Sequence, residues 1–242
     1  MKNINILKLD SCNSTNTRLA EIAGEMPHAT VLTTREQTAG RGQRGNTWEA
    51  EPGKNLTFSL LLRPEGVAAR DQFYISEAVA LGIKDALKHY LPNREVAIKW
   101  PNDIYVDDKK ICGILIENTL SGNNIGRSIA GIGLNVNQTE FMSDAPNPVS
   151  MTQLSGATYD LDEVMTRIVT SILERLEQPN DTRHCDYMES LRYRQGANYI
   201  DTATGEMFFA TISDVATTGH LSLTDSNGAT RVYAFKEVTL VL

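Results

Sequence analysis

The sequence contains few cysteines and histidines, and it has no long apolar run. Its cysteines, Cys12, Cys112 and Cys185, are scattered and form no C-x-x-C pair, and the four histidines are equally dispersed. This spacing argues against a disulfide framework and against a histidine-based metal centre, so we expect reduced thiols. The apolar stretches are too short to cross a membrane, and polar residues interrupt the N-terminus too often for a signal peptide. The sequence therefore predicts a cytoplasmic protein without a membrane segment.

Positive charge is also scarce. The 23 lysines and arginines are outnumbered by 30 acidic residues, which gives a net charge of −7, and no basic run is present. That balance argues against a nucleic-acid-binding surface. With 242 residues, 41% of them apolar and 22% charged, the chain has the composition of a globular protein. It could form one large domain, or one domain with a small companion.

Apolar periodicity predicts an α+β fold in which helices flank a mixed β-sheet. Strands are expected at residues 4–9, 30–34, 55–63, 96–100, 103–106, 111–117 and 128–134, and helices at residues 17–23, 74–91 and 161–176. After residue 193 the pattern changes to short strand-like runs separated by turns such as Thr204-Gly205 and Asn227-Gly228. This pattern predicts a small β-barrel. We therefore divide the chain into a larger domain, residues 1–192, and a smaller one, residues 193–242.

A glycine-rich loop at residues 40–48 is the most informative segment. Its three glycines have the G-x-G-x-x-G spacing of dinucleotide-binding and kinase loops. However, Pro52 prevents the helix that must follow a Rossmann loop, and Thr47 stands where a kinase loop needs valine. The loop also carries Arg41 and Arg44. Glycines that expose backbone N–H groups, together with arginines, predict a cradle for phosphate or carboxylate.

Four further groups of polar residues fit the same anionic ligand. They are Ser14-Thr15-Asn16, Gln37, Lys99-Trp100-Pro101-Asn102-Asp103, and Lys110 with Gly113. The first three have simpler alternatives, because they could cap a helix, form a surface amide and make a solvated turn, respectively. In the fourth, a lysine enters an apolar strand that contains a glycine, and such a glycine often marks close approach by a ligand or another backbone.

Together these motifs resemble those of biotin protein ligases. Five segments occur in the order of that family's motifs over about the first 140 residues. They are Gly-Arg-Gly-x-Arg-Gly-x-x-Trp, Pro-Gly-x-Asn-Leu, Lys-Trp-Pro-Asn-Asp, Lys-Ile-x-Gly-Ile-Leu-Ile-Glu and Gly-Ile-Gly-Leu-Asn-Val-Asn. The resemblance implies a catalytic domain like that of class II aminoacyl-tRNA synthetases, followed by an SH3-like domain. It also implies the monofunctional type, without the N-terminal DNA-binding domain of biotin-responsive repressors, because the first strand of the catalytic domain is expected already at residues 4–9.

The resemblance implies a two-step reaction. ATP, as its Mg²⁺ complex, and biotin first form biotinyl-5′-AMP and pyrophosphate, and biotin then passes to a lysine of a biotin carboxyl carrier domain of a carboxylase. Both small molecules are substrates, and no tightly bound prosthetic group is expected. The expected partners include neither nucleic acid nor membrane, and relatives occur as monomers or homodimers.

The same resemblance assigns roles to individual residues. It implies catalytic roles for Lys110, Arg41, Arg44 and Asp103. It implies that biotin binds at Ser14, Thr15, Asn16, Gln37, Gly40, Arg41, Gly42, Gln43, Lys110, Gly113 and Leu115. It implies that ATP binds at Arg41, Arg44, Trp48, Lys99, Asn102 and Asn135, with Asp103 as a Mg²⁺ ligand or as a group that orients the acceptor amine.

Alternative functions make different predictions. A lipoate or octanoate transferase or ligase shares the expected fold but lacks the Gly-Arg-Gly-x-Arg-Gly-x-x-Trp segment. A non-catalytic biotin sensor would be expected to lack Lys110 or Arg41, and both are present. One position departs from the pattern, because Gln43 stands where many relatives carry arginine. Loss of that charge predicts faster release of the adenylate.

Overall fold

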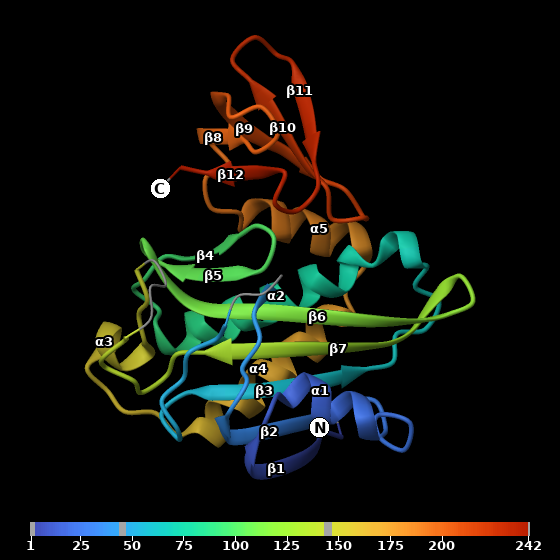
Figure 1. Ribbon diagram of the computed structural model, residues 1–242, viewed down its shortest axis with the longest axis vertical. Coiled ribbons are helices and arrows are strands. Elements are labelled where there is room, and N and C mark those ends of the chain that lie inside the picture. Colours follow the sequence, from blue (N-terminus) through green and yellow to red (C-terminus); the bar gives the residue numbers. More distant parts are fainter. Residues whose placement is uncertain (1–2, 44–46, 143–146, 242) are drawn as a thin grey trace.

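The computed structural model describes residues 3–43, 47–142 and 147–241 (Figure 1). Its larger part is a seven-stranded sheet in the order β1-β2-β3-β7-β6-β5-β4. Strands β1 and β2 are parallel and the other neighbours are antiparallel, so the sheet is mixed, as the sequence predicts. The strands are β1 (Asn5–Cys12), β2 (Thr30–Gln37), β3 (Leu56–Leu62), β4 (Val96–Lys99), β5 (Asp103–Val106), β6 (Lys109–Ser121) and β7 (Asn124–Leu134).

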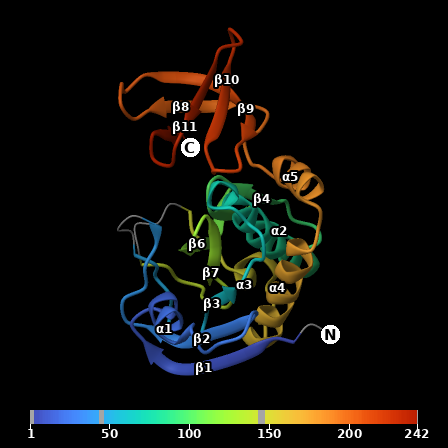
Figure 2. The ribbon, with the colours of Figure 1, turned by 90° about the vertical axis from the view of Figure 1, so that its right-hand side faces the viewer.

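Helices cover the two faces of this sheet unequally (Figure 2). Two long helices, α2 (Phe73–Tyr90) and α4 (Leu161–Leu176), pack together over one face. The short helix α1 (Thr15–Ile22) lies on the other face, against β2, β3 and β7. Further helical segments are η2 (Ala69–Asp71), α3 (Met151–Ser155) and α5 (Asn180–Glu189). Because α1 covers only part of its face, space for a site remains there.

Strand β3 shows how the two faces differ. All of its residues are buried, and alternate side chains point to opposite faces. Phe58 and Leu60 join the large apolar core that includes α2 and α4. On the other face Leu61 packs in a small cluster with Leu19 of α1, and Ser59 donates hydrogen bonds to side chains of the first turn of α1. One face of the sheet is thus an apolar core, and the other carries polar groups.

The C-terminal part forms a second sheet in the order β11-β10-β9-β8-β12 (Figure 1). Its strands are β8 (Ala197–Asp201), β9 (Met207–Val215), β10 (Leu221–Asp225), β11 (Thr230–Tyr233) and β12 (Val238–Leu240). The predicted small β-barrel is present as a five-stranded sheet that does not close, because β11 and β12 do not pair within the described residues. The short strands themselves are present as expected. The proposed division at residue 193 stays a prediction.

The C-terminal sheet is attached to the larger sheet and its helices at several places, two of which involve the side chains of Trp100 and His184. In one, the Trp100 Nε1 group donates a hydrogen bond to the Gly219 carbonyl at 3.1 Å. In the other, His184 of α5 contacts Glu77 of α2 through Nδ1 (2.7 Å) and Asp214 of β9 through Nε2 (3.2 Å). We call Glu77, His184 and Asp214 the histidine latch. It joins α2, α5 and the C-terminal sheet.

Burial and neighbouring charges raise the pKa values of Glu77 and His184. Burial raises the pKa of Glu77, and the hydrogen bond from His184 offsets this only in part. Burial alone would lower the pKa of His184, but Glu77 and Asp214 outweigh that effect and raise it. Arg183 lies 3.8 Å from Glu77, and the buried phenol of Tyr187 also lies near the Glu77 carboxylate.

Two expectations about composition can be compared with the structure. Among the described residues, no helix combines the length and the apolar character needed to cross a bilayer. All three cysteines are free, as their spacing predicts.

Candidate functional site

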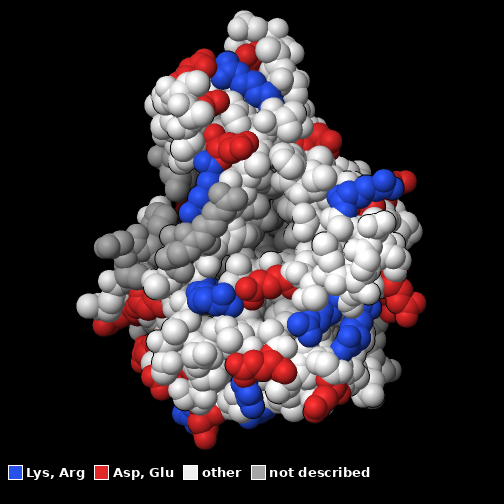
Figure 3. All heavy atoms as spheres, turned by 45° about the vertical axis from the view of Figure 1, so that its right-hand side comes forward, with Lys and Arg blue, Asp and Glu red and all other residues white. Residues whose placement is uncertain are grey.

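A cavity of about 1090 Å³ lies between the α1 face of the large sheet and the inner face of the C-terminal sheet. Figure 3 shows the surface hollowed beneath the C-terminal sheet. The cavity brings together most of the predicted site residues: Ser14, Thr15, Asn16, Gln37, Arg41, Gly42, Gln43, Trp48, Lys99, Asn102, Asp103, Lys110, Gly113, Leu115 and Asn135. Gly40 lies behind the wall, where a Cβ would come within 2.8 Å of the Trp48 carbonyl oxygen. Arg44 lies outside the described residues.

Ser14 occupies the N-cap position of α1 but does not cap it. Its backbone is extended, with φ −155° and ψ 133°, and its side chain makes no capping hydrogen bond. The side chain is also buried, with 5% exposure. Helix capping was the simpler explanation for a serine at this place. Ser14 lines the cavity, and because its hydroxyl does not cap the helix, it is suited to bind a ligand.

Thr15 and Gln37 form the adjoining part of the wall. The Gln37 Oε1 atom accepts hydrogen bonds from the Thr15 backbone N–H (2.8 Å) and from its hydroxyl (3.2 Å). Ser59 donates to the Thr15 hydroxyl from β3 at 2.7 Å. These bonds fix the end of β2 against the start of α1, so Gln37 is part of a rigid polar wall and not a loose surface amide.

Asn16 serves mainly to connect elements. It is 3% exposed, its Oδ1 accepts from Ser59 at 2.5 Å, and its Nδ2 donates to the Leu115 carbonyl and to Glu117 at 3.2 and 2.8 Å. A Cβ on Gly131 would overlap the Asn16 side chain. Asn16 therefore holds α1 against β6 and β7, and a ligand would have to compete with these contacts.

Glycines on β6 and β7 make room for the Trp48 ring. A Cβ on Gly133 would overlap the indole, and one on Gly113 would lie 3.0 Å from it. The Trp48 Nε1 atom is buried and has no hydrogen-bond partner among the described residues. The two glycines thus let a large aromatic surface lie flat beside the cavity.

Lys110 and Asp103 form an ion pair at the centre of the motif residues. The Lys110 Nζ lies 2.7 Å from the Asp103 Oδ1, and the two side chains are 25% and 14% exposed. Strand pairing of β5 with β6 brings them together. Next to them the Asn102 Nδ2 donates to the Ile114 carbonyl at 2.9 Å, which fixes the turn before β5.

Lys99 lies deeper, beside Tyr105. Its Nζ is 5.9 Å from the centroid of the Tyr105 ring. Burial lowers the pKa of Lys99, and the neighbouring Lys110 and Arg192 lower it further, while Asp103 opposes the shift. Burial also raises the pKa of Tyr105 to about 12, so this phenol stays neutral. Several cationic side chains therefore lie together in a part of the cavity that is only partly exposed to water.

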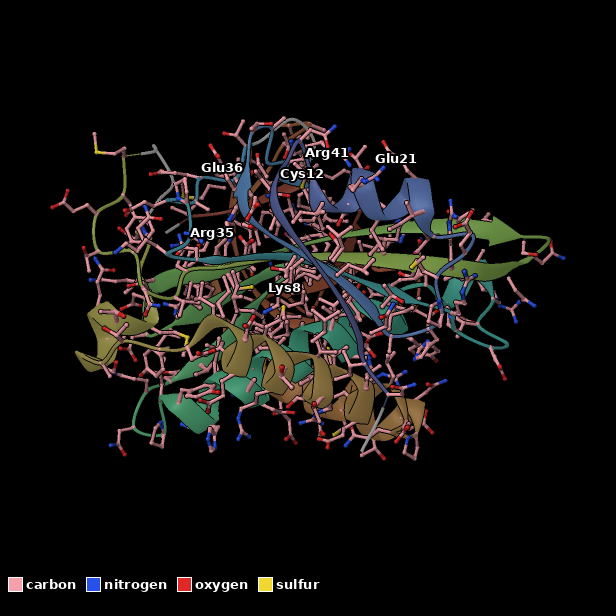
Figure 4. The ribbon with its side chains drawn as sticks, turned by 90° about the horizontal axis from the view of Figure 1, so that it is seen from below. Lys8, Cys12, Glu21, Arg35, Glu36 and Arg41 are labelled. Atoms are coloured by element: carbon pink, nitrogen blue, oxygen red, sulfur yellow. The ribbon has the colours of Figure 1, made fainter. Side chains whose placement is uncertain are left out.

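Arg41 is held at the rim by an acidic residue of β6. Its Nη2 donates to the Glu117 Oε2 and to the Thr17 hydroxyl, each at 3.2 Å. Figure 4 shows Arg41 beside the first part of α1, where it contacts Thr17. The Arg41 side chain is 47% exposed, so it can turn toward a ligand at little cost.

Asn135 directly follows β7, and only the nitrogen of its carboxamide has a hydrogen-bond partner among the described residues. It is 4% exposed, and its Nδ2 donates to the Val149 carbonyl at 3.1 Å. Its Oδ1 is buried without a partner among the described residues. An acceptor in that situation favours a ligand that donates.

The Mg²⁺ assignment stays a prediction. The described residues include no group of three potential metal ligands, and the Asp103 carboxylate is paired with Lys110. Sequence reasoning missed four residues that shape the site: Ser59, Tyr105, Glu117 and Arg192. Glu117 ends one of the quoted motifs and could have been found there. The other three carry no motif signal, because their contacts come from segments distant in sequence.

Comparison with known proteins places this site in a family. The sequence profile of the Biotin/lipoate A/B protein ligase family matches residues 9–135, just over half of the chain. The chain belongs to this family. Curated relatives include the bifunctional ligase/repressor BirA of Bacillus subtilis, 29% identical over 245 residues that cover 93% of this chain and 71% of the relative. The biotin–[acetyl-CoA-carboxylase] ligase of Paracoccus denitrificans is 34% identical over 158 residues, 63% of this chain and 65% of the relative.

A solved structure extends the likeness to the whole chain. Biotin protein ligase from Aquifex aeolicus in complex with biotin and ATP has a TM-score of 0.79 and 25% identity, and the match covers 98% of both chains. The present chain is thus a ligase with the fold of biotin protein ligases. The family match contains every site residue that the sequence predicted, whereas Arg192 and the C-terminal sheet lie outside it.

Proposed function

We propose that this ligase is an ATP-dependent biotin protein ligase. It forms biotinyl-5′-AMP from biotin and ATP, and then transfers biotin to a lysine of a biotin carboxyl carrier domain. The name of the Paracoccus denitrificans relative supports a carboxylase as the source of that domain. The observation that carries the proposal is that four of the five motifs meet in one cavity around Lys110.

The cavity is large for a ligand site. Ligand pockets usually measure about 300–1,000 Å³, and this cavity measures about 1090 Å³. Ser14, whose hydroxyl caps no helix, offers with Thr15 and Gln37 hydroxyl and amide groups for the ureido ring of biotin. Asn135, with its unpaired acceptor, is suited to the amino group of adenine, and Trp48 presents a flat surface for a base.

In the first step a biotin carboxylate oxygen attacks the α-phosphorus of ATP, and the bond to the β-phosphate bridging oxygen breaks, so pyrophosphate leaves. Two anions must approach each other, and the site must supply positive charge where negative charge gathers. Lys110 is the cation best placed for this, because it lines the cavity and Asp103 fixes its ammonium at 2.7 Å. Arg41 can close from the rim over the product.

In the second step the acceptor amine attacks the carbonyl carbon of the mixed anhydride. A new C–N bond forms, the bond to the AMP oxygen breaks, and the amine loses a proton. The Asp103 carboxylate can orient the amine in exchange for Lys110. The open position of the cavity beneath the C-terminal sheet leaves a path for a carrier domain (Figure 3).

The proposal is tested by pyrophosphate release from ATP with biotin or lipoate, with and without a carrier domain. We expect one burst of pyrophosphate with biotin alone, and continued turnover once the carrier is added. A response to lipoate but not to biotin would assign the protein to the other branch of the family. Binding of biotin without pyrophosphate release would assign it to a non-catalytic sensor.

A further inference from the structure

Arg192 lines the cavity but belongs to no recognised motif. It lies after α5, outside the segment that matches the family. The chain here runs beside β4, because Ile98 N–H donates to the Ser190 carbonyl and Arg192 N–H donates to the Ile98 carbonyl, each at 2.8 Å. This pairing places Arg192 next to Lys99, the last residue of β4.

The guanidinium of Arg192 is held in one position. It lies over two aromatic rings, 5.4 Å from the Tyr105 centroid and 4.5 Å from the Tyr193 centroid. Its Nη1 donates to the Asp107 carbonyl and its Nη2 to the Asp108 carboxylate. The side chain is 12% exposed, and its Nε is buried without a hydrogen-bond partner among the described residues. A fixed donor that lacks an acceptor is prepared for a ligand.

The cations of this region are only partly neutralised. Lys99 and Arg192 contact the same Tyr105 ring, and Lys110 already pairs with Asp103. The carboxylate on Arg192 belongs to Asp108, which is 88% exposed, so water screens its charge. Three cations around a partly desolvated space are costly by themselves, and a polyanion would relieve their repulsion.

We propose that Arg192, together with Lys99, forms a polyphosphate subsite that holds the β- and γ-phosphates of ATP and the departing pyrophosphate. Arginine suits this task because its planar fork offers several N–H donors to phosphate oxygens. As the bond between the α-phosphorus and the bridging oxygen breaks, negative charge grows on that oxygen, and Arg192 stabilises it. This inference rests on the proposed adenylation, but it concerns pyrophosphate binding, which can be measured without biotin.

The test is calorimetric binding of inorganic pyrophosphate to the full chain. Arg192→Gln removes the charge and the fork, and Arg194→Gln, at an exposed arginine two residues away, is the matched control. We expect the pyrophosphate Kd of Arg192→Gln to rise about tenfold or more, as loss of a charged hydrogen bond predicts, and that of Arg194→Gln to stay unchanged. In turnover, the KM for ATP should rise and the KM for biotin should not.

An unchanged pyrophosphate Kd in folded Arg192→Gln would overturn the proposal and leave Arg192 as a link between the segment after α5 and the turn between β5 and β6. If Arg192→Gln does not fold, Arg192→Lys decides, because lysine keeps the charge but loses the fork. Its Kd should then rise, and a Kd equal to wild type would contradict the subsite. Biotin-dependent activity without Arg192-dependent pyrophosphate binding would refute this inference alone. Arg192-dependent binding without biotin-dependent pyrophosphate release would refute the proposed function alone.

Discussion

The two faces of the large sheet use the same strands for opposite purposes. Toward α2 and α4, side chains such as Phe58 and Leu60 are fully buried in a continuous apolar core. Toward α1, the same strand presents Ser59 to a hydrogen-bonded wall, and the neighbouring strands carry glycines that leave space. Alternation along a strand therefore lets one sheet supply stability on one side and a binding site on the other. Substitutions on the two faces should separate stability from activity.

The largest difference between the effect on activity and the effect on stability is expected at Lys110. Lys110→Ala removes the cation that stabilises the developing negative charge, so we expect adenylate formation to slow by at least about 100-fold. The side chain is at the cavity and outside the core, so the Tm should stay near that of wild type. Single-turnover formation of biotinyl-5′-AMP measures the first effect and calorimetry the second. Near wild-type activity in this variant would contradict the site assignment.

Phe58→Ala should produce the opposite result. The side chain has 0% exposure in the core, and truncation of a buried phenylalanine costs about 3–5 kcal/mol of unfolding free energy. At a temperature where the variant is folded, its KM for ATP should match wild type. Urea unfolding and steady-state kinetics measure the two quantities. A raised KM with unchanged stability would reverse the roles of the two faces.

Ser14 and Asp160 both occupy helix N-cap positions, but only Asp160 caps its helix. Asp160 at the start of α4 accepts a hydrogen bond from the Glu163 backbone N–H at 3.0 Å, whereas Ser14 caps nothing. Asp160→Ala should therefore cost about 1 kcal/mol of stability and leave biotin affinity unchanged. Ser14→Ala should leave stability within about 0.5 kcal/mol and weaken biotin binding about tenfold. Equal behaviour of the two variants would remove Ser14 from the binding site.

The histidine latch predicts a smaller effect that depends on pH. The folded-state pKa values of His184 and Glu77 both lie above their ordinary values, so the folded protein binds more protons than the unfolded chain. For His184 this contribution to stability is complete below about pH 6.5, the ordinary histidine pKa. It is lost as the pH rises through the raised value.

Thermal unfolding between pH 6 and pH 9 tests this prediction. The Tm of the wild-type chain should fall across that range, and His184→Gln should make the profile flatter. Biotin affinity should not follow the same curve, because the latch lies outside the cavity. A His184→Gln profile parallel to wild type would show that the latch does not titrate there.

The smallest expected change concerns Gln43. This residue lines the cavity, and Gln43→Arg adds a positive charge beside a negatively charged product. Release of biotinyl-5′-AMP should therefore become slower, which a chase with unlabelled adenylate can measure. Equal release rates in the two proteins would show that position 43 does not retain the product.

Strong periodicity explains which elements the sequence predicts well. Helix α4 begins and ends at the predicted residues 161 and 176, and α2 is shifted by a single residue at each end. The short helix α5 was not predicted, because its sequence is largely polar and only Arg183, Tyr187 and Met188 are buried. Strands β6 and β7 extend beyond the predicted bounds into an exposed hairpin, where polar residues hide the pattern.

The residues of the site also differ in how well the sequence predicts them. Residues that lie within motifs, such as Lys110 and Asp103, could be predicted together because each motif has a local spacing. The partners that orient them could not, because the contact of Ser59 with α1 and the approach of Arg192 to Lys99 depend on strand order. An arginine outside any motif, such as Arg192, has no sequence signal that distinguishes it from a solvated one.

The most direct test of the central claim is isotope exchange between pyrophosphate and ATP in the absence of any carrier domain. If the cavity around Lys110 carries out reversible adenylation of biotin, labelled pyrophosphate should enter ATP only when biotin is present, and Lys110→Ala should suppress the exchange. Exchange that does not depend on biotin, or that survives in Lys110→Ala, would contradict the account.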